Sequence, residues 1–332
     1  MNAHEAAYYE KTDGGSVRCR LCPHNCRIKD GNHGICGARK NSGGSLVTEI
    51  YGRLTAVAMD PIEKKPLYHF HPGSSILSIG TRGCNMKCPY CQNWHISQDH
   101  AARTSFYSSS DIVSAAVREG SIGIAYTYSE PIIWFEYVHD TAVLAREKKL
   151  VNVMVTNGFI NREPLEQLLG VIDAMNIDLK TFREETMKKV QKAKLPDVLA
   201  TIRLAHERGC HIELTTLVVT GINDDMDEMK DIIDFIASVD KNIPWHISRY
   251  YPNYQYDKHA TDVSFIMKVH EAAEKKLSFV YCGNVSSNER GHDTRCPSCG
   301  ATVIGRTGYF TRIEQLKNGA CARCGYNLGI IR

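Results

Sequence analysis

Cysteine spacing is the feature of this 332-residue chain that most directly indicates chemistry. Cysteines a few residues apart are typical metal ligands in a reducing compartment, where disulfides are rare. Of the 13 cysteines, Cys210 and Cys282 stand singly near apolar runs, as buried small hydrophobic residues do. The others form three short groups: Cys19, Cys22, Cys26 and Cys36; Cys84, Cys88 and Cys91; and Cys296, Cys299, Cys321 and Cys324.

The central group predicts a metal centre with an open coordination position. Its three cysteines lie on one tight loop rich in turn residues, at 80–91, directly after a short apolar run. Three thiolates are one fewer than a closed structural zinc site uses. An iron–sulfur cube held by three cysteines keeps one iron open, and open positions are where metal chemistry occurs. A zinc site completed by His95 or by a distant residue is the alternative.

The elements that would position this loop begin at about residue 75, where short β-type runs alternate with amphipathic helical segments. Such alternation predicts a parallel sheet. Six or seven units are too few for a complete eight-stranded barrel, so we expect a partial barrel, with a doubly wound sheet as the alternative. In both architectures functional groups gather at the carboxyl ends of the strands. The expected strands are 76–79, 123–126, 151–156, 174–177, 212–218, 246–250 and 278–281.

The spacing Cys84-x-x-x-Cys88-x-x-Cys91, with the aromatic Tyr90 before the last cysteine, resembles the signature of the radical S-adenosylmethionine (SAM) superfamily. The resemblance implies a partial (β/α)6 barrel over 71–286, whose three cysteines hold a [4Fe–4S] cluster. SAM would bind the open iron. One electron, from a reduced ferredoxin or flavodoxin, would then cleave SAM to a 5′-deoxyadenosyl radical that abstracts hydrogen from a substrate.

Other segments resemble SAM-binding stretches of the same superfamily. The turn Thr127-Tyr-Ser-Glu-Pro131 stands where relatives have a Gly-Gly-Glu-Pro-type turn; its glycines are replaced, so only Glu130 carries over, as a partner of the SAM amino group. Asp178-Leu-Lys180 resembles the Asp-x-Lys segment of glycyl-radical-enzyme activases, and by the same analogy His246 lies near the nucleoside. Taken alone, an Asp-x-Lys is usually a solvated pair and a Glu-Pro usually starts a helix.

A closer resemblance is to the radical SAM component of the AmmeMemoRadiSam system. It is carried by the segments Cys19-Arg-Leu-Cys22-Pro-His-Asn-Cys26, Asp60-Pro-Ile-Glu-Lys-Lys-Pro-Leu-Tyr-His69 and Cys91-Gln-Asn-Trp94-His-Ile-Ser97. This implies Memo-like and AMMECR1-like proteins as partners and leaves the reaction open. Installing a glycyl radical on a protein is the leading hypothesis for an unidentified substrate. Modification of a small metabolite, another protein side chain or nucleic acid is the alternative.

The two flanking cysteine groups predict separate metal modules. Cys296-Pro-Ser-Cys299 and Cys321-Ala-Arg-Cys324 form paired knuckles that suit structural zinc, with a rubredoxin-like iron as the alternative, in a zinc-ribbon-like module over 287–332. The four N-terminal cysteines lie in a Cys-rich module with its connector over 1–70. Zinc is the simplest interpretation there, and an auxiliary iron–sulfur cluster is its rival. His24 in place of one cysteine, or no metal at all, completes the alternatives.

Composition and charge restrict the class of protein. A net charge of +3 argues against a dedicated binder of nucleic acid or acidic membranes. No apolar stretch is long enough to span a bilayer, and the N-terminus lacks the apolar region of a secretion signal, so we expect a cytoplasmic protein. A non-enzymatic metal-binding scaffold and an electron carrier are the alternatives to an enzyme; a carrier would leave SAM intact.

Overall fold

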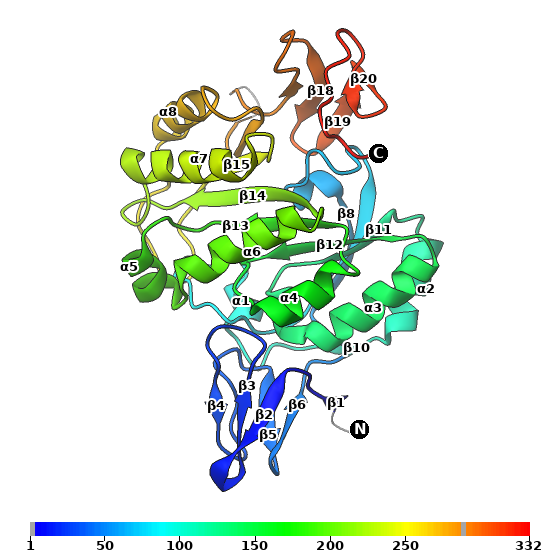
Figure 1. Ribbon diagram of the computed structural model, residues 1–332, viewed down its shortest axis with the longest axis vertical. Helices are drawn as coiled ribbons and strands as arrows, with labels where there is room; N and C mark the ends of the chain where they lie inside the picture. Colours follow the sequence, from blue (N-terminus) through cyan, green and yellow to red (C-terminus); the bar gives the residue numbers. More distant parts are fainter. Residues whose placement is uncertain (1–3, 287–289) are drawn as a thin grey trace.

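An eight-stranded, largely parallel sheet organises the computed structural model, which describes residues 4–286 and 290–332 (Figure 1). Its order is β16-β15-β14-β13-β12-β11-β9-β8, and only the edge strand β8 pairs antiparallel with its neighbour. The strands are β8 (Ala56–Pro61), β9 (Ser75–Gly80), β11 (Gly123–Tyr126), β12 (Val151–Thr156), β13 (Ala174–Asp178), β14 (His211–Val218), β15 (Trp245–Arg249) and β16 (Val280–Gly283).

The partial barrel expected from the sequence is confirmed as the fold class. Each parallel strand lies within two residues of its expected run. The strands are short runs of buried, mostly apolar residues, as expected for a parallel sheet covered on both faces. The largest shift is in β16, which begins at Val280, two residues later than expected. Strand β8 falls within the segment expected as module and connector, and it extends the sheet.

Helices connect successive strands of the sheet (Figure 1). Side-chain caps start three of them: Ser108, Asp225 and Asp262 accept hydrogen bonds from first-turn amides. None of the helices in the described part of the chain has the length and apolar character needed to cross a membrane. The helices are α1 (Trp94–Ser97), α2 (Ser109–Arg118), α3 (Phe135–Glu147), α4 (Arg162–Leu169), α5 (Glu184–Thr186), α6 (Leu195–Glu207), α7 (Met226–Asp240) and α8 (Val263–Ala273), with shorter turns at Asp13–Gly15, Ile62–Lys64, Pro131–Trp134 and Met187–Gln191.

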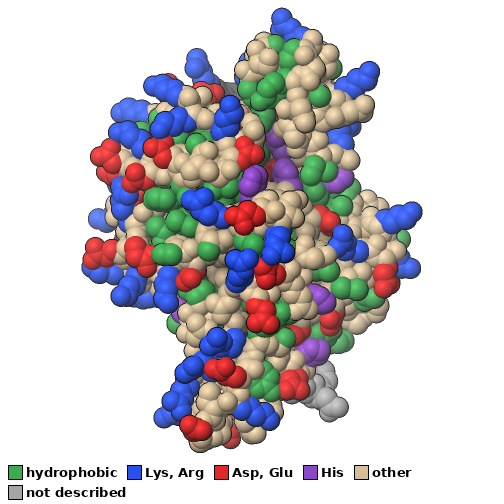
Figure 2. Space-filling model, in the orientation of Figure 1, with side chains coloured by type: hydrophobic (Ala, Val, Ile, Leu, Met, Phe, Trp, Pro, Cys, Tyr) green, Lys and Arg blue, Asp and Glu red, His purple; other side chains and the backbone are tan. Residues whose placement is uncertain are grey.

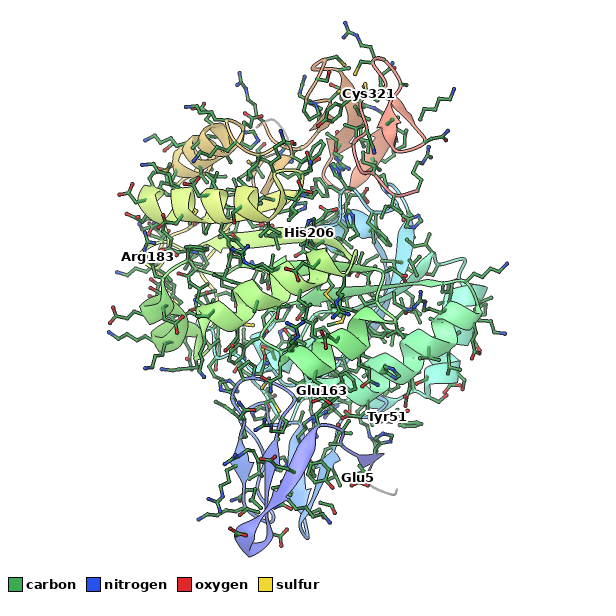
Figure 3. All side chains as sticks on the ribbon, viewed as in Figure 1. Glu5, Tyr51, Glu163, Arg183, His206 and Cys321 are labelled. Carbon is green, nitrogen blue, oxygen red and sulfur yellow. The ribbon has the colours of Figure 1, made fainter. Side chains whose placement is uncertain are left out.

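Small sheets lie at the two ends of the molecule, where Figure 3 labels Glu5 and Cys321. The N-terminal end carries two three-stranded sheets, and the C-terminal end carries a three-stranded sheet and a hairpin. A further pair, β7 with β10, lies between the N-terminal sheets and the barrel. The strands are β1 (His4–Glu5), β2 (Tyr9–Thr12), β3 (Ser16–Cys19), β4 (Arg27–Ile28), β5 (Arg39–Ser42), β6 (Ser45–Thr48), β7 (Arg53–Leu54), β10 (Ser105–Phe106), β17 (Thr294–Arg295), β18 (Thr302–Thr307), β19 (Phe310–Ile313), β20 (Leu316–Lys317) and β21 (Ala320–Cys321).

A buried ion pair joins the N-terminal sheets to the barrel. Arg39 of β5 donates to Glu136 of α3, and both side chains are almost fully buried. The second Arg39 amino group donates to Ala7 O at 2.7 Å. Two charges removed from water in this way stabilise the fold only while they remain together.

Replacing Arg39 by methionine should therefore lower the free energy of unfolding by about 3 to 5 kcal/mol, because Glu136 would stay buried without its partner. The matched control is Arg18→Met, which removes an exposed ion pair with Glu10 (3.4 Å) and should cost below about 1 kcal/mol. Urea unfolding followed by circular dichroism measures both. Equal midpoints for the two variants would contradict the structural role of the buried pair.

Candidate active site

The three central cysteines lie on the loop after β9, at the carboxyl edge of the sheet. Cys88 is buried, and Cys84 and Cys91 are half-buried. Met86 N donates to Cys84 Sγ at 3.3 Å, and Cys91 Sγ lies 3.1 Å from a serine hydroxyl of α1. Burial raises the pKa of the Cys88 thiol to about 11 and the pKa of the Cys84 thiol well above its usual value. Buried thiolates here require a cation to neutralise them.

The donor set of this loop fits an iron–sulfur cluster better than a single zinc ion. Four Zn–S bonds of about 2.3 Å in a tetrahedron place the sulfur atoms about 3.8 Å apart. Within the described ranges, the C-terminal cysteines are the one group with three or more ligand atoms inside 4.8 Å of one another. The central sulfur atoms are therefore more widely spaced, and His95, exposed on α1, does not complete a compact site with them. A four-iron cube holds its thiolates farther apart than one ion does.

Glu130 is buried beside this loop, after β11. Its carboxylate accepts hydrogen bonds from Thr156 Oγ1 (2.6 Å), Asn157 N (2.8 Å) and Ile132 N (3.2 Å). Burial raises its pKa to about 7, although these hydrogen bonds oppose the shift. Between about pH 4.5 and 7 the folded chain holds a proton on Glu130 that the unfolded chain has released. This group therefore lowers the free energy of unfolding as the pH rises through that window.

Asn157 links Glu130 to the cysteine loop, a connection that the sequence did not predict. While its backbone amide binds Glu130, its side-chain Nδ2 donates to Asn85 Oδ1 at 2.9 Å and lies 3.7 Å from Cys84 Sγ. The sequence feature that could have predicted this link is the polar segment Thr156-Asn-Gly158, which ends an expected strand.

Asp178, Lys180 and Tyr90 meet at Cys88. Lys180 Nζ donates to Asp178 Oδ2 at 2.7 Å. Burial on its own lowers the pKa of Lys180, but the Asp178 carboxylate, with smaller contributions from Cys88 and Tyr90, raises it well above its usual value. Tyr90 is buried, and its hydroxyl accepts a hydrogen bond from Gln191 at 2.8 Å. The carboxyl end of β13 thus places an ammonium group next to the most buried cysteine of the loop.

His246 belongs to a different cluster of the described side chains. Its Nε2 lies 2.6 Å from Glu213 Oε2, and its ring stacks on Tyr281. Burial opposes ionisation of Glu213, but hydrogen bonds with His211 and His246 hold the pKa of Glu213 well below its usual range. Glu213 Oε1 also accepts from the backbone of His69 at 2.7 Å. Within residues 4–286 and 290–332, no hydrogen bond, ion pair or ring contact joins His246 to the cysteine loop.

A second polar cluster, of Asp60, Lys65 and Tyr128, was not expected from the sequence. Asp60 of β8 accepts hydrogen bonds from Lys65 Nζ (2.6 Å), from Lys64 Nζ (2.8 Å) and from the Tyr128 hydroxyl. Burial lowers the pKa of Lys65 to about 8 although Asp60 opposes the shift. Tyr128 adopts a φ of 68° in the turn that also holds Glu130. This cluster joins the edge strand β8 to the turn at the candidate site.

The four C-terminal cysteines form a compact group whose sulfur atoms could share one metal ion. Cys296 Sγ lies 3.5 Å from Cys324 Sγ, and Cys299 Sγ lies 3.8 Å from Cys321 Sγ. These distances match the edges of the tetrahedron that four thiolates form around one zinc ion. Gly300 and Gly325 follow the knuckles with φ of 70° and 77°, which lets the backbone turn back toward the sulfur atoms.

The N-terminal cysteines line one small cavity together with Arg39 and Ile133. Cys19, Cys22 and Cys36 are buried and Cys26 is half-buried. His24 does not face this cavity; its Nε2 lies 2.7 Å from the backbone oxygen of Asn85 on the central loop.

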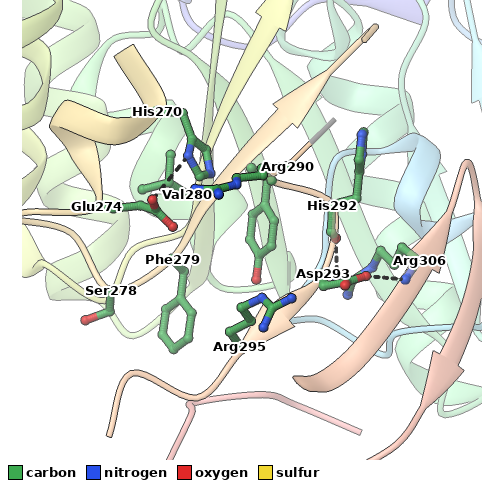
Figure 4. A pocket seen from close by; sticks show the side chains of 12 residues that line it. His270, Glu274, Ser278, Phe279, Val280, Arg290, His292, Asp293, Arg295 and Arg306 are labelled. Carbon is green, nitrogen blue, oxygen red and sulfur yellow. Dashed lines mark hydrogen bonds and ion pairs between the residues drawn. The ribbon is translucent and has the colours of Figure 1, made fainter. Parts of the chain in front are cut away.

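Two surface hollows lie beside the C-terminal sheets, away from the cysteine loop. The first, of about 590 Å³, lies between α8 and β17, where Figure 4 shows Arg290, Arg295 and Arg306 with His270 and its ion-pair partner Glu274. Figure 2 shows histidine side chains gathered between the sheet and the C-terminal sheets; the second hollow there includes His206 and His211. Neither hollow is lined by an expected site residue.

Three comparisons with known proteins, by family model, by sequence and by structure, point to the same superfamily. Residues 78–236 match the family model of the Radical SAM superfamily. Uncharacterized protein MJ0808 of Methanocaldococcus jannaschii is 41% identical over 98% of this chain and 99% of its own length. The pyruvate formate-lyase-activating enzyme of Streptococcus mutans is 23% identical over 49% of this chain and 65% of its own length. The structure of Streptococcus suis SuiB bound to S-adenosylmethionine shares the fold, with a TM-score of 0.51 at 14% identity, over 63% of this chain and 52% of that chain.

Proposed function

Because this chain belongs to the radical SAM superfamily, we propose that it is an enzyme that holds a [4Fe–4S] cluster on Cys84, Cys88 and Cys91. The bound cluster and SAM supply one-electron cleavage of SAM and abstraction of a hydrogen atom from a substrate. The observation that carries the proposal is the gathering of three partly or fully buried thiols, Glu130 and Lys180 at the carboxyl edge of one parallel sheet.

In this proposal, charged side chains of the protein favour cluster binding at the cysteines and bind the SAM amino group. Lys180 lowers the pKa of Cys88 against the larger effect of burial and so favours the thiolate that a metal requires. Tyr90, on the loop itself, is buried and is held by a hydrogen bond from the buried Gln191. Glu130, fixed by hydrogen bonds from its neighbours, offers a carboxylate to the SAM amino group, where a charge-assisted hydrogen bond would form.

The role of Glu130 predicts that SAM binds more tightly as the pH rises from about 6 to about 7.5, because Glu130 ionises in this range while an α-amino group stays protonated. Glu130→Gln should remove this dependence and weaken binding by about 10-fold to 100-fold, as expected for a lost hydrogen bond between charged groups. Isothermal titration calorimetry on the reconstituted protein measures both effects. Glu163→Gln, at an exposed carboxylate on α4 (Figure 3), is the control; if it behaves as Glu130→Gln does, the assignment is wrong.

The proposed activity is tested by anaerobic reconstitution with iron and sulfide, followed by SAM and dithionite. We expect 5′-deoxyadenosine, quantified by chromatography. Protein with a complete central cluster that leaves SAM intact would contradict the proposal and favour an electron carrier or a metal-binding scaffold.

For the substrate, we propose another protein, on which the enzyme installs a glycyl radical. The likeness to an activating enzyme, which covers 49% of the chain, supports this choice. A reduced ferredoxin or flavodoxin is the proposed electron donor. Memo-like and AMMECR1-like proteins, suggested by the sequence resemblance, are the first partners to test. A partner that acquires an organic radical signal in electron paramagnetic resonance (EPR) would support protein activation. SAM cleavage stimulated only by a small metabolite or by nucleic acid would favour the alternatives.

A further inference from the structure

We propose that Cys19, Cys22, Cys26 and Cys36 hold a second [4Fe–4S] cluster, separate from the cluster on the central loop and packed directly against that loop. The sequence left zinc and an auxiliary cluster open at this position. The spacing and the surroundings of the four thiols favour the cluster. This inference goes beyond the proposed function and does not depend on SAM cleavage.

The first argument is the spacing of the sulfur atoms. All four thiols line one cavity, so they can share one metal centre. Over residues 4–286 and 290–332, however, three or more ligand atoms come within 4.8 Å of one another at the C-terminal cysteines alone. The N-terminal sulfur atoms are thus spaced too widely for the tetrahedron of about 3.8 Å edges around one zinc ion. Four thiols around one cavity with this wider spacing fit a four-iron cube.

The second argument is the contact between the N-terminal cavity and the central loop. Gly83 has a φ of 94°, and a Cβ there would lie 2.7 Å from Cys36 O and 3.0 Å from Ile133 Cδ1. Ile133 itself lines the N-terminal cavity. On the other side of Cys84, Asn85 O lies 2.7 Å from His24 Nε2. Both neighbours of Cys84 therefore contact residues of the segment that carries the N-terminal thiols.

The third argument is that hydrogen-bond donors face the N-terminal sulfur atoms. Arg39 Nη1 lies 3.8 Å from Cys19 Sγ. Hydrogen bonds to cluster sulfurs are among the features that tune iron–sulfur sites. The backbone amides involved are those of His24 at Cys22, Ile35 at Cys26, and Ala38 and Arg39 at Cys36.

The test counts metals in the full-length chain after anaerobic reconstitution. The wild type should contain about eight irons and eight sulfides per chain. The double variants Cys22→Ser/Cys36→Ser and Cys84→Ser/Cys88→Ser should each keep about four of both. Cys210→Ser, which changes a thiol outside the three groups, should match the wild type. EPR spectra of the dithionite-reduced wild type should show interaction between two spins that either double variant removes.

Zinc analysis of the same samples separates the outcomes. If Cys22→Ser/Cys36→Ser removes one zinc and no iron, or changes neither metal, the proposal is wrong. If this variant misfolds, the iron content of Cys84→Ser/Cys88→Ser tests the proposal, because the N-terminal thiols of that variant are intact. About four irons per chain would support the second cluster. An iron-free protein would overturn it. A wild type with only the N-terminal cluster would instead contradict the proposed function and leave this inference standing.

Discussion

Replacing Cys88 by alanine should abolish SAM cleavage while the chain stays folded. Cys88 is the most buried thiol of the central loop, and it is the one beside Lys180. Its removal would take away one of three proposed ligands, so the cluster would lose a protein anchor and become open to water. Lys180 would keep Asp178 as a partner at 2.7 Å, so no unpaired buried charge would remain.

The measurement is 5′-deoxyadenosine formed per chain, with iron content and circular dichroism recorded on the same samples. Cys210→Ala is the matched control, since it makes the same change at a half-buried thiol outside the cysteine groups. We expect wild-type product from the control and only background from Cys88→Ala. If Cys88→Ala retained full iron and full cleavage, Cys88 would not be a ligand and the central loop would need another third donor.

Much of the fold could be predicted from the sequence because its signals are local. Each parallel strand is a short apolar run followed by a polar tip, so strand positions follow from a few residues at a time. The same local signal placed Glu130 and Asp178 at strand ends. The structure links Glu130 to the central loop through Asn157 and pairs Asp178 with Lys180 beside Cys88. Position along a parallel sheet is enough to predict such neighbours, because the carboxyl ends of the strands meet at one edge.

The polar cluster around Asp60 could not be predicted in this way. Tyr128 and Asp60 are 68 residues apart in sequence, and their hydrogen bond depends on the antiparallel pairing of β8 with β9. In the sequence, Lys65 stands among charged residues and resembles a solvated side chain, whereas in the structure it is buried. His246 illustrates the same limit, because its partner Glu213 lies on the neighbouring strand β14.

Cysteine spacing along the chain predicts that metals bind but does not determine which metal binds. The N-terminal and C-terminal groups both contain Cys-x-x-Cys pairs, yet only the C-terminal set, among the described residues, gathers its sulfur atoms as one ion requires. The difference arises from the scaffold. Two hairpin knuckles turn the C-terminal thiols toward a common point, while the N-terminal thiols lie around a cavity that side chains of Arg39 and Ile133 also line.

If the four C-terminal cysteines hold zinc, Cys321→Ser should remove it and unfold the C-terminal module, while the barrel remains folded. The hydrophobic core of the module is small, so the module depends on a bound metal for its stability. Structural zinc stabilises small domains by on the order of 10 kcal/mol, far more than this core could replace. The buried aliphatic residues of the module are Val303, Ile304, Leu316, Leu328 and Ile330, packed against Tyr68, Phe279 and Tyr281.

Hydrogen–deuterium exchange would measure this effect residue by residue. The module holds residues 68–71 in place, because Arg306 donates to Tyr68 O at 2.9 Å and His71 N donates to Ile331 O at 2.7 Å. Unfolding should therefore speed exchange in 294–332 and also at His71, but not in β11 or β12. Cys210→Ser is the control. If Cys321→Ser lost its zinc yet kept wild-type protection in 294–332, the metal would not be structural, and the packing on Tyr68 alone would have to hold the module.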